Sequence, residues 1–181
     1  GAPGGKLKVL TETQVLEIHK ASIYILTEVG FSEHSKAVEQ EILQAGGSLN
    51  SHGRLVFSLE CIESALIGLN RNVVLYGQDK AHDLNLSGTN VHFGTGGAYP
   101  EMVDFETGNY RDSTLLDIYN TARLVDKLEH VHFFSRPFFA RDIENTKVAD
   151  VNTAFACLSG TSKHVIVSSF FPEHVREIFD M

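Results

Sequence analysis

The sequence predicts an α/β protein, in which a helical α+β preamble (residues 1–88) is followed by three strand–helix units (residues 89–181). Two observations carry this prediction. Three short segments rich in β-branched and aromatic residues begin near residues 91, 131 and 164, with helical patterns between them. A glycine-rich stretch, Gly94-Thr95-Gly96-Gly97, directly follows the first of them. Strands that alternate with helices indicate a parallel sheet with right-handed crossovers.

The preamble begins with a long helical pattern over residues 11–29. Thr11 and Gln14 have the spacing of a capping box, and Gly30 suits a left-handed helix end. Apolar positions at intervals of three and four predict one buried stripe, made of Val15, Ile18, Ser22, Ile25 and Val29. A second helix near 33–45, a hairpin over 48–57, a helix capped by Ser58 and short strands at 73–76 and 84–86 complete the preamble.

The second part repeats strand and helix. The first strand, 91–94, leads through the glycine stretch to a turn at 106–109, and Ser113 or Thr114 caps the helix that follows. Helices are also predicted at 145–159 and from Pro172, the latter with Val175, Ile178 and Phe179 on its inner side. Three strands complete neither an open doubly wound sheet nor an eight-fold barrel, which typically needs about 250 residues. We therefore expect the N-terminal part of a longer protein, truncated in the last helix.

Composition limits the function classes. The net charge of −8 is unfavourable for a protein that binds the nucleic-acid backbone. No apolar run approaches the ~20 residues of a membrane span. The two cysteines, Cys61 and Cys157, fall in predicted helices, so reduced thiols and a cytoplasmic location are expected.

The glycine stretch has three interpretations. It fails as a dinucleotide fingerprint, because its third glycine is not in register and because Pro100 and a strand follow where a helix is required. It lacks the lysine of a P-loop. The remaining interpretations are a structural turn and a ligand-facing loop at the carboxyl end of the first parallel strand, where α/β folds place their sites.

Common catalytic and metal-binding patterns are missing from the sequence. The nine histidines are scattered, and only His130 and His132 lie close together, so no metal site is predicted. No nucleophile elbow occurs, and neither cysteine has a cationic neighbour in the sequence that would favour a thiolate. The sequence therefore identifies no catalytic residue.

Aromatic residues follow the carboxyl ends of all three strands. Tyr99, Phe138-Phe139 and Phe170-Phe171 should converge on one face. They either pack under the loops or form an aromatic mouth, a setting that attracts quaternary ammonium groups. Arg136, among them, could hold an anionic group or pair with a loop carboxylate.

Several segments together resemble the trimethylamine methyltransferase family, in order and over essentially the whole chain. They are Pro3-Gly4-Gly5, Leu10-Thr11-Glu12, Glu28-Val29-Gly30, Val73 to Gly77, Phe93 to Gly97, Asp104, Glu106-Thr107-Gly108, Ser113-Thr114-Leu115 and Asp117. The resemblance implies the N-terminal portion of a TIM (β/α)8 barrel behind a helical preamble. It also implies transfer of a methyl group from trimethylamine, or a quaternary amine such as a betaine, to a corrinoid (cobalamin) carried by a partner protein and not held tightly by this chain.

From their location we assign a substrate- or corrinoid-facing rim, formed by Gly94, Gly96, Gly97, Tyr99, Arg136, Phe138 and Phe170. The family includes members with pyrrolysine and members without it, and we expect the discriminating position beyond Met181. This chain is expected to be too short for activity. Its unpaired strand edges predict either that it self-associates as a homo-oligomer or that it was cut from a larger protein after folding. Two alternatives stay open: a corrinoid- or amine-binding module without turnover, and an unrelated, complete open α/β protein.

Overall fold

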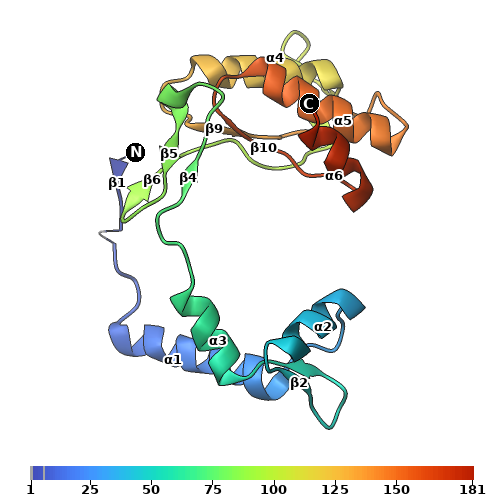
Figure 1. Cartoon of the computed structure of the whole chain (residues 1–181). Helices are drawn as coiled ribbons and strands as arrows, with labels where there is room; N and C mark the ends of the chain where they lie inside the picture. Colours follow the sequence, from blue (N-terminus) through green and yellow to red (C-terminus); the bar gives the residue numbers. More distant parts are fainter. Residues whose placement is uncertain (1, 6) are drawn as a thin grey trace. The chain divides into compact units, whose positions relative to one another are not determined.

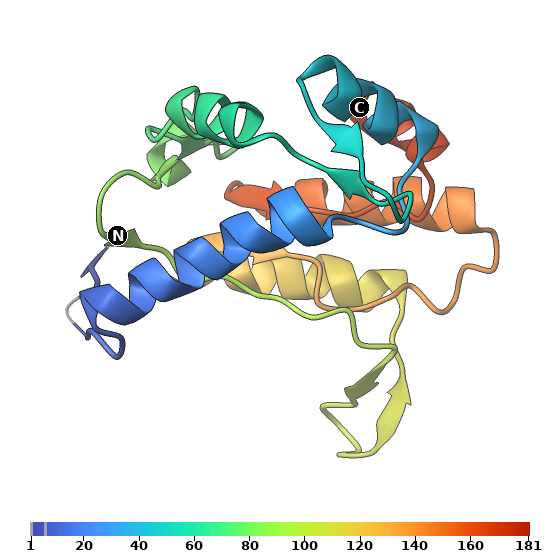
Figure 2. The ribbon, with the colours of Figure 1, turned by 90° about the horizontal axis from the view of Figure 1, so that it is seen from below.

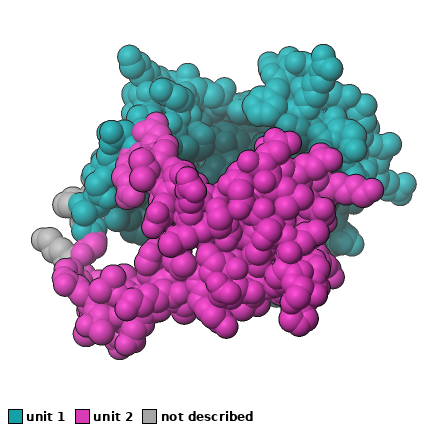
Figure 3. All heavy atoms as spheres, turned by 60° about the horizontal axis from the view of Figure 1, so that its bottom comes forward, with its two compact units in different colours: residues 1–4, 72–181 teal, residues 5–71 magenta. Residues whose placement is uncertain are grey.

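The computed structural model describes residues 2–5 and 7–181 and divides the chain into two compact units (Figure 3). Unit 1 comprises residues 1–4 and 72–181, and unit 2 comprises residues 5–71. The predicted division of the chain into a preamble and strand–helix units after residue 88 stays a prediction.

Unit 2 contains three helices and a hairpin. The elements are α1 (Glu12–Tyr24), which continues into the π-helical turn η1 (Ile25–Val29), then α2 (Lys36–Gln44), β2 (Ser48–Leu49), β3 (Leu55–Val56) and α3 (Leu59–Ile67). The predicted capping box is confirmed: Gln14 N donates to Thr11 Oγ1 at 3.2 Å, and Thr11 N donates to Gln14 Oε1 at 2.9 Å. Ser58 caps α3 as predicted, and β2 and β3 pair antiparallel as the predicted hairpin.

The predicted buried stripe of the first helix is wrong. Val15, Ile18 and Ile25 are each more than half exposed, and Val29 is 39% exposed. The small core of this unit, Leu55, Val56 and Ile62, lies at the hairpin and α3. The hairpin reaches only the last turns of the long helix, where Phe57 N donates to Leu26 O at 3.0 Å. The face that is partly buried there carries Ile23, Leu26 and Thr27 instead of the predicted stripe.

Unit 1 begins with short antiparallel pairs. β1 (Ala2–Pro3) pairs with β6 (Asn90–Val91), and β4 (Val74–Leu75) pairs with β5 (Leu84–Asn85) around the 3-10 turn η2 (Lys80–His82). β7 (Glu101–Val103) and β8 (Tyr110–Asp112) form a hairpin, which projects away from the helices of this unit (Figure 2). The strand–helix part follows as α4 (Leu115–Lys127), β9 (Phe133–Ser135), α5 (Thr146–Gly160), β10 (His164–Ile166) and α6 (Pro172–Phe179).

The predicted parallel arrangement is present between β9 and β10. His164 lies opposite Phe133, and Ile166 lies opposite Ser135. Gly94 forms a parallel bridge to Phe133 on the other side of β9, so the order across the sheet is Gly94, β9, β10. Within the described residues the strands form two-stranded sheets and no closed barrel.

The first predicted parallel strand, 91–94, is shorter than expected. Residues 90–91 pair with β1, and only Gly94 bridges β9. Two side chains interrupt the hydrogen-bond ladder between residues 91–94 and the segment that leads into β9. The ring of His132 accepts the backbone N–H of Phe93 at 2.9 Å, and the ammonium of Lys163 donates to Val131 O at 2.6 Å. The backbone groups that would extend the ladder are therefore already engaged.

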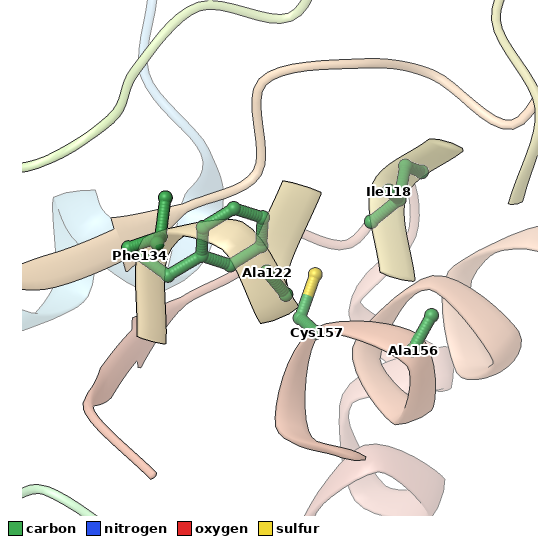
Figure 4. Close-up of a cluster of buried hydrophobic side chains, with 6 residues drawn as sticks. Ile118, Ala122, Phe134, Ala156 and Cys157 are labelled. Carbon is green, nitrogen blue, oxygen red and sulfur yellow. The ribbon is translucent and has the colours of Figure 1, made fainter. Parts of the chain in front are cut away.

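The main core lies between the parallel strands and the helices that connect them. α4 and α5 cover one face of β9 and β10 (Figure 1). The core cluster consists of Ile118, Ala122, Val125, Phe134, Ala156 and Cys157. Figure 4 shows a close-up of this cluster. Thr114, the second of the two predicted caps, begins α4 in a reciprocal capping box with Asp117.

The inner face predicted for the last helix is only partly correct. α6 begins at Pro172 as predicted, and Ile178 is half-buried. Phe179 is 84% exposed, because α6 packs on α5 and nothing in the described chain covers its last turn. No helix in the described part of the chain combines the length and the apolar character needed to span a bilayer.

Candidate functional site

The glycine stretch lies against β9 and is shaped by two aromatic rings. A Cβ atom on Gly94 would collide with the ring of Phe133. Gly97 has a φ of +123°, and a Cβ there would meet the ring of Tyr99. Gly96 differs, because no atom lies within 4 Å of the position of its Cβ. Close packing therefore requires glycine at 94 and 97, whereas Gly96 borders open space.

Hydrogen bonds fix this loop to the end of β9 and to the loop that follows it. The hydroxyl of Thr95 donates to Ser135 O at 2.7 Å and accepts from Ser135 N at 2.9 Å. Further along, Tyr99 N donates to Pro137 O at 2.9 Å, and Phe139 N donates to Tyr99 O at 3.0 Å. The first two parallel segments thus remain side by side beyond their carboxyl ends.

Arg136 occupies the centre of these loops. Its side chain lies at the end of β9, and the residue is only 8% exposed. The Nη2 atom donates to Ser168 Oγ, after β10, at 3.0 Å. The guanidinium carbon lies 4.7 Å from the ring centre of Phe139 and 6.0 Å from that of Phe170. The two rings are stacked at 5.9 Å, so one arginine joins the loops after β9 and β10.

A pocket of about 510 Å³ opens beside Arg136. We call it the Arg136 pocket, and its lining comprises Pro100, Arg136, Phe139, Ala140, Arg141, Ile143, Thr146, Ala149, Thr153 and Phe170. Thr146 and Ala149 belong to the first turns of α5. The lining therefore combines apolar rings, two arginines and a helix N-terminus.

The structure separates the predicted rim into two groups. Gly94, Gly96, Gly97 and Tyr99 lie on the glycine loop, with Tyr99 62% exposed. Arg136 and Phe170 contribute to the Arg136 pocket. Phe138 bridges to Tyr99 through its backbone, while its side chain packs against the core cluster. Its neighbour Phe139 is the residue that reaches the pocket.

Asp150 is a functional candidate that the sequence reasoning missed. Its side chain is fully buried in α5, and its Oδ2 accepts hydrogen bonds from Ser169 Oγ, Phe170 N and His174 Nδ1 at 2.8, 2.8 and 2.6 Å. Burial opposes ionisation, but these donors outweigh it and hold the pKa of Asp150 below its ordinary value. The carboxylate thereby anchors the loop that carries Phe170. A lone acidic residue within an apolar helix was its only sequence signal.

The amino ends of the parallel strands hold a different cluster. The ammonium of Lys163 donates to the carbonyls of Val125, Leu128 and Val131 at 2.6–2.7 Å, at the end of α4. Burial lowers the pKa of Lys163, and it lowers the pKa of His132 nearby. Each donor of the ammonium is satisfied, which indicates a structural role. No group of His, Cys, Asp and Glu within residues 2–5 and 7–181 is arranged to hold a metal ion.

Comparison with known proteins decides the family. A family model described as trimethylamine methyltransferase (MTTB) matches residues 3–181. The chain belongs to the trimethylamine methyltransferase family. Among its relatives, trimethylamine methyltransferase MttB1 of Methanosarcina mazei is 30% identical over 165 residues, which are 89% of this chain and 33% of that protein.

Two bacterial relatives extend the comparison for this trimethylamine methyltransferase family member. Trimethylamine methyltransferase MttB of Desulfitobacterium hafniense strain DCB-2 is 26% identical over 179 residues, which are 98% of this chain and 36% of that protein. A protein of strain Y51 named glycine betaine methyltransferase is 28% identical over 128 residues, which are 70% of this chain and 26% of that protein. The chain spans about a third of the length of the trimethylamine methyltransferases that it matches.

Proposed function

We propose that the protein carrying this chain transfers a methyl group from a methylated amine to the corrinoid of a separate partner protein. The observation that carries the proposal is the family match over residues 3–181. Relatives named for trimethylamine and for glycine betaine support a methylated amine as the donor. Within this proposal the chain contributes part of the framework, and we assign no catalytic residue to it.

The proposal includes a TIM barrel of which this chain forms the beginning. In its favour, Gly94, β9 and β10 are neighbours in chain order, and α4 and α5 cover one face of the strands. A barrel has this arrangement, with helices outside and sites at the carboxyl ends of the strands. The free thiols Cys61 and Cys157 agree with a reducing compartment such as the cytoplasm.

The transfer is a displacement at carbon. The C–N bond of a quaternary amine, or of protonated trimethylamine, breaks with its electron pair going to nitrogen. The methyl carbon bonds to Co(I), which supplies two electrons and becomes Co(III). The protein must orient the amine and exclude water from the reduced cobalt. The corrinoid is here an acceptor substrate delivered by the partner. The open surface at Gly96 and the exposed ring of Tyr99 suit the approach of a large planar ring.

Visible spectroscopy tests the proposed reaction. The intact protein is mixed with a Co(I) corrinoid protein and with trimethylamine or glycine betaine in separate reactions. We expect the Co(I) spectrum to convert to that of methyl-Co(III) with at least one amine, together with release of the demethylated product. Amine binding in calorimetry without any methyl loss would contradict transfer and favour a binding module.

A substitution at Gly96 tests the proposed rim. No atom lies within 4 Å of a Cβ at position 96, and residue 96 is exposed, so we expect Gly96→Leu to retain the stability of the protein. If the corrinoid passes over this loop, the added side chain should raise the KM for the corrinoid protein about tenfold or more. Glu63→Leu, on the exposed surface of α3, is the matched control and should leave the KM unchanged. Equal KM values for both variants would remove Gly96 from the rim.

A further inference from the structure

We propose that the Arg136 pocket is a binding site for the carboxylate group of a small organic anion. The proposal goes beyond methyl transfer, because it assigns a ligand chemistry to a pocket that the reaction itself does not require. It begins from a buried cation without an acidic partner. Among the described residues, Arg111 pairs with Asp104 and Asp117, and Arg141 approaches Asp112 at 3.8 Å. Arg136 is more buried than either and has no such pair.

The hydrogen-bonding capacity of Arg136 is largely unused. A guanidinium has five N–H donors in a fixed plane, and in the described part of the chain only Nη2 has a hydrogen-bond acceptor, Ser168 Oγ. Burying a cation is unfavourable unless its charge and its donors are satisfied. The pocket lies directly beside the guanidinium. An anion in this pocket would supply both the charge and the acceptors.

The surroundings of the pocket are electropositive. Arg141 also lines it, and the first turn of α5, with Thr146 and Ala149, brings the positive end of a helix dipole. The described lining contains no Asp or Glu. The nearby carboxylate of Asp150 is turned to the donors of Ser169, Phe170 and His174. Its Oδ2 atom is therefore already engaged by three donors, whereas its buried Oδ1 atom has no hydrogen-bond partner among the described residues.

The same arrangement argues against an ammonium ligand in this pocket. The rings of Phe139 and Phe170 are the aromatic walls here, and Arg136 already lies over both. A methylated nitrogen placed on these rings would meet a like charge in a partly dehydrated pocket. The aromatic mouth inferred from the sequence is thus occupied by the protein's own cation at these two residues. Tyr99 lies outside the pocket lining and keeps its ring exposed.

A carboxylate fits better than phosphate. One planar guanidinium fork matches one carboxylate with two parallel hydrogen bonds. The apolar side chains of Phe139, Ile143, Ala149 and Phe170 suit the hydrocarbon part of an organic acid. A fully hydrated phosphate would gain little from such walls. The ligand class is therefore a small monocarboxylate, either free or as the acidic end of a zwitterion.

Calorimetric titration of the intact protein tests this site with defined probes. Sodium acetate, glycine betaine, tetramethylammonium chloride and sodium phosphate are titrated separately. We expect acetate or glycine betaine to bind, and tetramethylammonium neither to bind in this pocket nor to displace them. Competition between glycine betaine and acetate would show that the pocket accepts the carboxylate of a zwitterion. Binding of acetate alone would show that the ligand is a free carboxylic acid. If neither carboxylate binds, or phosphate binds more tightly than both, the proposal is overturned.

Two arginine variants locate the binding. Arg136→Met should weaken carboxylate binding about tenfold or more, the usual effect of losing a charge-assisted pair. Arg123→Met is the matched control, because Arg123 also lies over an aromatic ring, that of Tyr119 at 5.8 Å, but outside the pocket. The affinity of Arg123→Met for the carboxylate should stay within about twofold of wild type. Equal carboxylate affinity in wild type and Arg136→Met would refute the site.

A third variant covers the case in which Arg136→Met does not fold. Arg136→Lys keeps the charge but loses the planar fork, and we expect weaker acetate binding with a thermal midpoint close to wild type. Unchanged affinity in this folded variant would contradict the assignment. Methyl transfer is measured separately. Transfer from trimethylamine without carboxylate binding would refute this inference alone, whereas carboxylate binding without any transfer would refute the proposed function alone.

Discussion

Arg111 connects the hairpin β7–β8 to the first turn of α4 through two carboxylates. Its Nε donates to Asp104 Oδ2 at 2.9 Å, and its two Nη atoms donate to the carboxylate oxygens of Asp117 at 2.7 and 2.8 Å. These bonds lower the pKa of both Asp104 and Asp117 to about 2. A carboxyl group with a lower pKa in the folded state than in the unfolded state stabilises the folded protein. This stabilisation is fully present at pH values above the unfolded pKa of 3.8, and it is lost as the pH falls through the folded pKa of about 2.

Carbon-13 NMR titration of the carboxyl groups tests this network. In the wild-type protein the pKa of Asp117 should lie near 2, and in Arg111→Met it should move toward the ordinary value of 3.8. Asp126 is the internal control, because Ser162, Thr161 and Lys127 hold its pKa below the ordinary value without Arg111. An unchanged Asp117 midpoint in the variant would show that Arg111 does not carry the shift.

Lys163 gives a second prediction for a single residue. Its ammonium satisfies three carbonyls at and just beyond the end of α4, and the residue is 3% exposed. Lys163→Met should lower the free energy of unfolding by about 3 kcal/mol, because buried acceptors lose charged donors. Lys127→Met removes a lysine that is exposed and pairs only at the surface with Asp126, and should cost about 0.5 kcal/mol or less. Denaturant titration compares the two, and similar losses would contradict a structural role specific to Lys163.

The close packing of α5 against α4 depends on Gly160. A Cβ atom on Gly160 would lie 2.5 Å from that of Ala122 and 3.0 Å from Tyr119 O, both of which are rigid neighbours. Gly160→Ala should therefore destabilise unit 1 by about 1–3 kcal/mol through overpacking. Thermal or denaturant unfolding measures the change. Unaltered stability would mean that the two helices separate without cost.

The control for this helix contact is another helix-terminal glycine. Gly68 ends α3 with a φ of −73°, which alanine adopts readily, and its nearest potential contact is 3.4 Å away. Gly68→Ala should be neutral or stabilise by about 0.4–1 kcal/mol, because it reduces the conformational freedom of the unfolded chain. The stability changes expected for Gly160→Ala and Gly68→Ala have opposite signs, so comparing them separates the effect of packing from that of backbone entropy.

Local sequence signals predicted the helices and strands well, but they did not predict the contacts between these elements. Thr11, Ser58 and Pro172 begin helices where the sequence indicated, because a cap depends on residues three positions apart. The buried face of the first helix could not be read from its apolar spacing, since the hairpin meets only its last turns. In the same way, His132 and Lys163 shorten the first parallel strand through contacts far apart in the sequence.

The candidate site shows the same division. Chain order alone predicted that the loops after the strands meet. The bridge between Tyr99 and Phe138 joins the first loop to the second, and the stacking of Phe139 on Phe170 joins the second to the third. Periodicity could not tell which of Phe138 and Phe139 faces the pocket, because both lie in the irregular loop after β9. The burial of Asp150, and of Arg136 without an acidic partner, depends on where α5 packs. Such tertiary environments have no local sequence signal.

At the scale of the whole molecule, the two ends of the parallel strands have different chemistry. At the amino ends, Lys163 and Asp126 have their charges satisfied by the chain itself. At the carboxyl ends, Arg136 retains free donors beside a pocket. Binding sites of barrel and doubly wound folds lie at carboxyl ends, and stabilising contacts lie at the opposite ends. We therefore expect Lys163→Met to reduce stability and Arg136→Met to reduce binding.

The edge of the parallel sheet leads to the last prediction. In the described part of the chain β10 pairs only with β9, so its other edge presents unpaired backbone groups beside Ile166, which is 42% exposed. Open edges of this kind promote pairing between chains. We expect the 181-residue chain, purified by itself, to form oligomers whose sedimentation coefficient rises with protein concentration.

A charged side chain at this edge should suppress the association. Ile166→Lys places a lysine on the strand, the device by which natural edge strands avoid pairing. Ile67→Lys is the matched control, because Ile67 is even more exposed, at 86%, but ends a helix in the other unit. If β10 mediates the association, only Ile166→Lys should shift sedimentation toward the monomer. A monodisperse wild-type monomer at high concentration, or suppression by Ile67→Lys alone, would contradict pairing through β10.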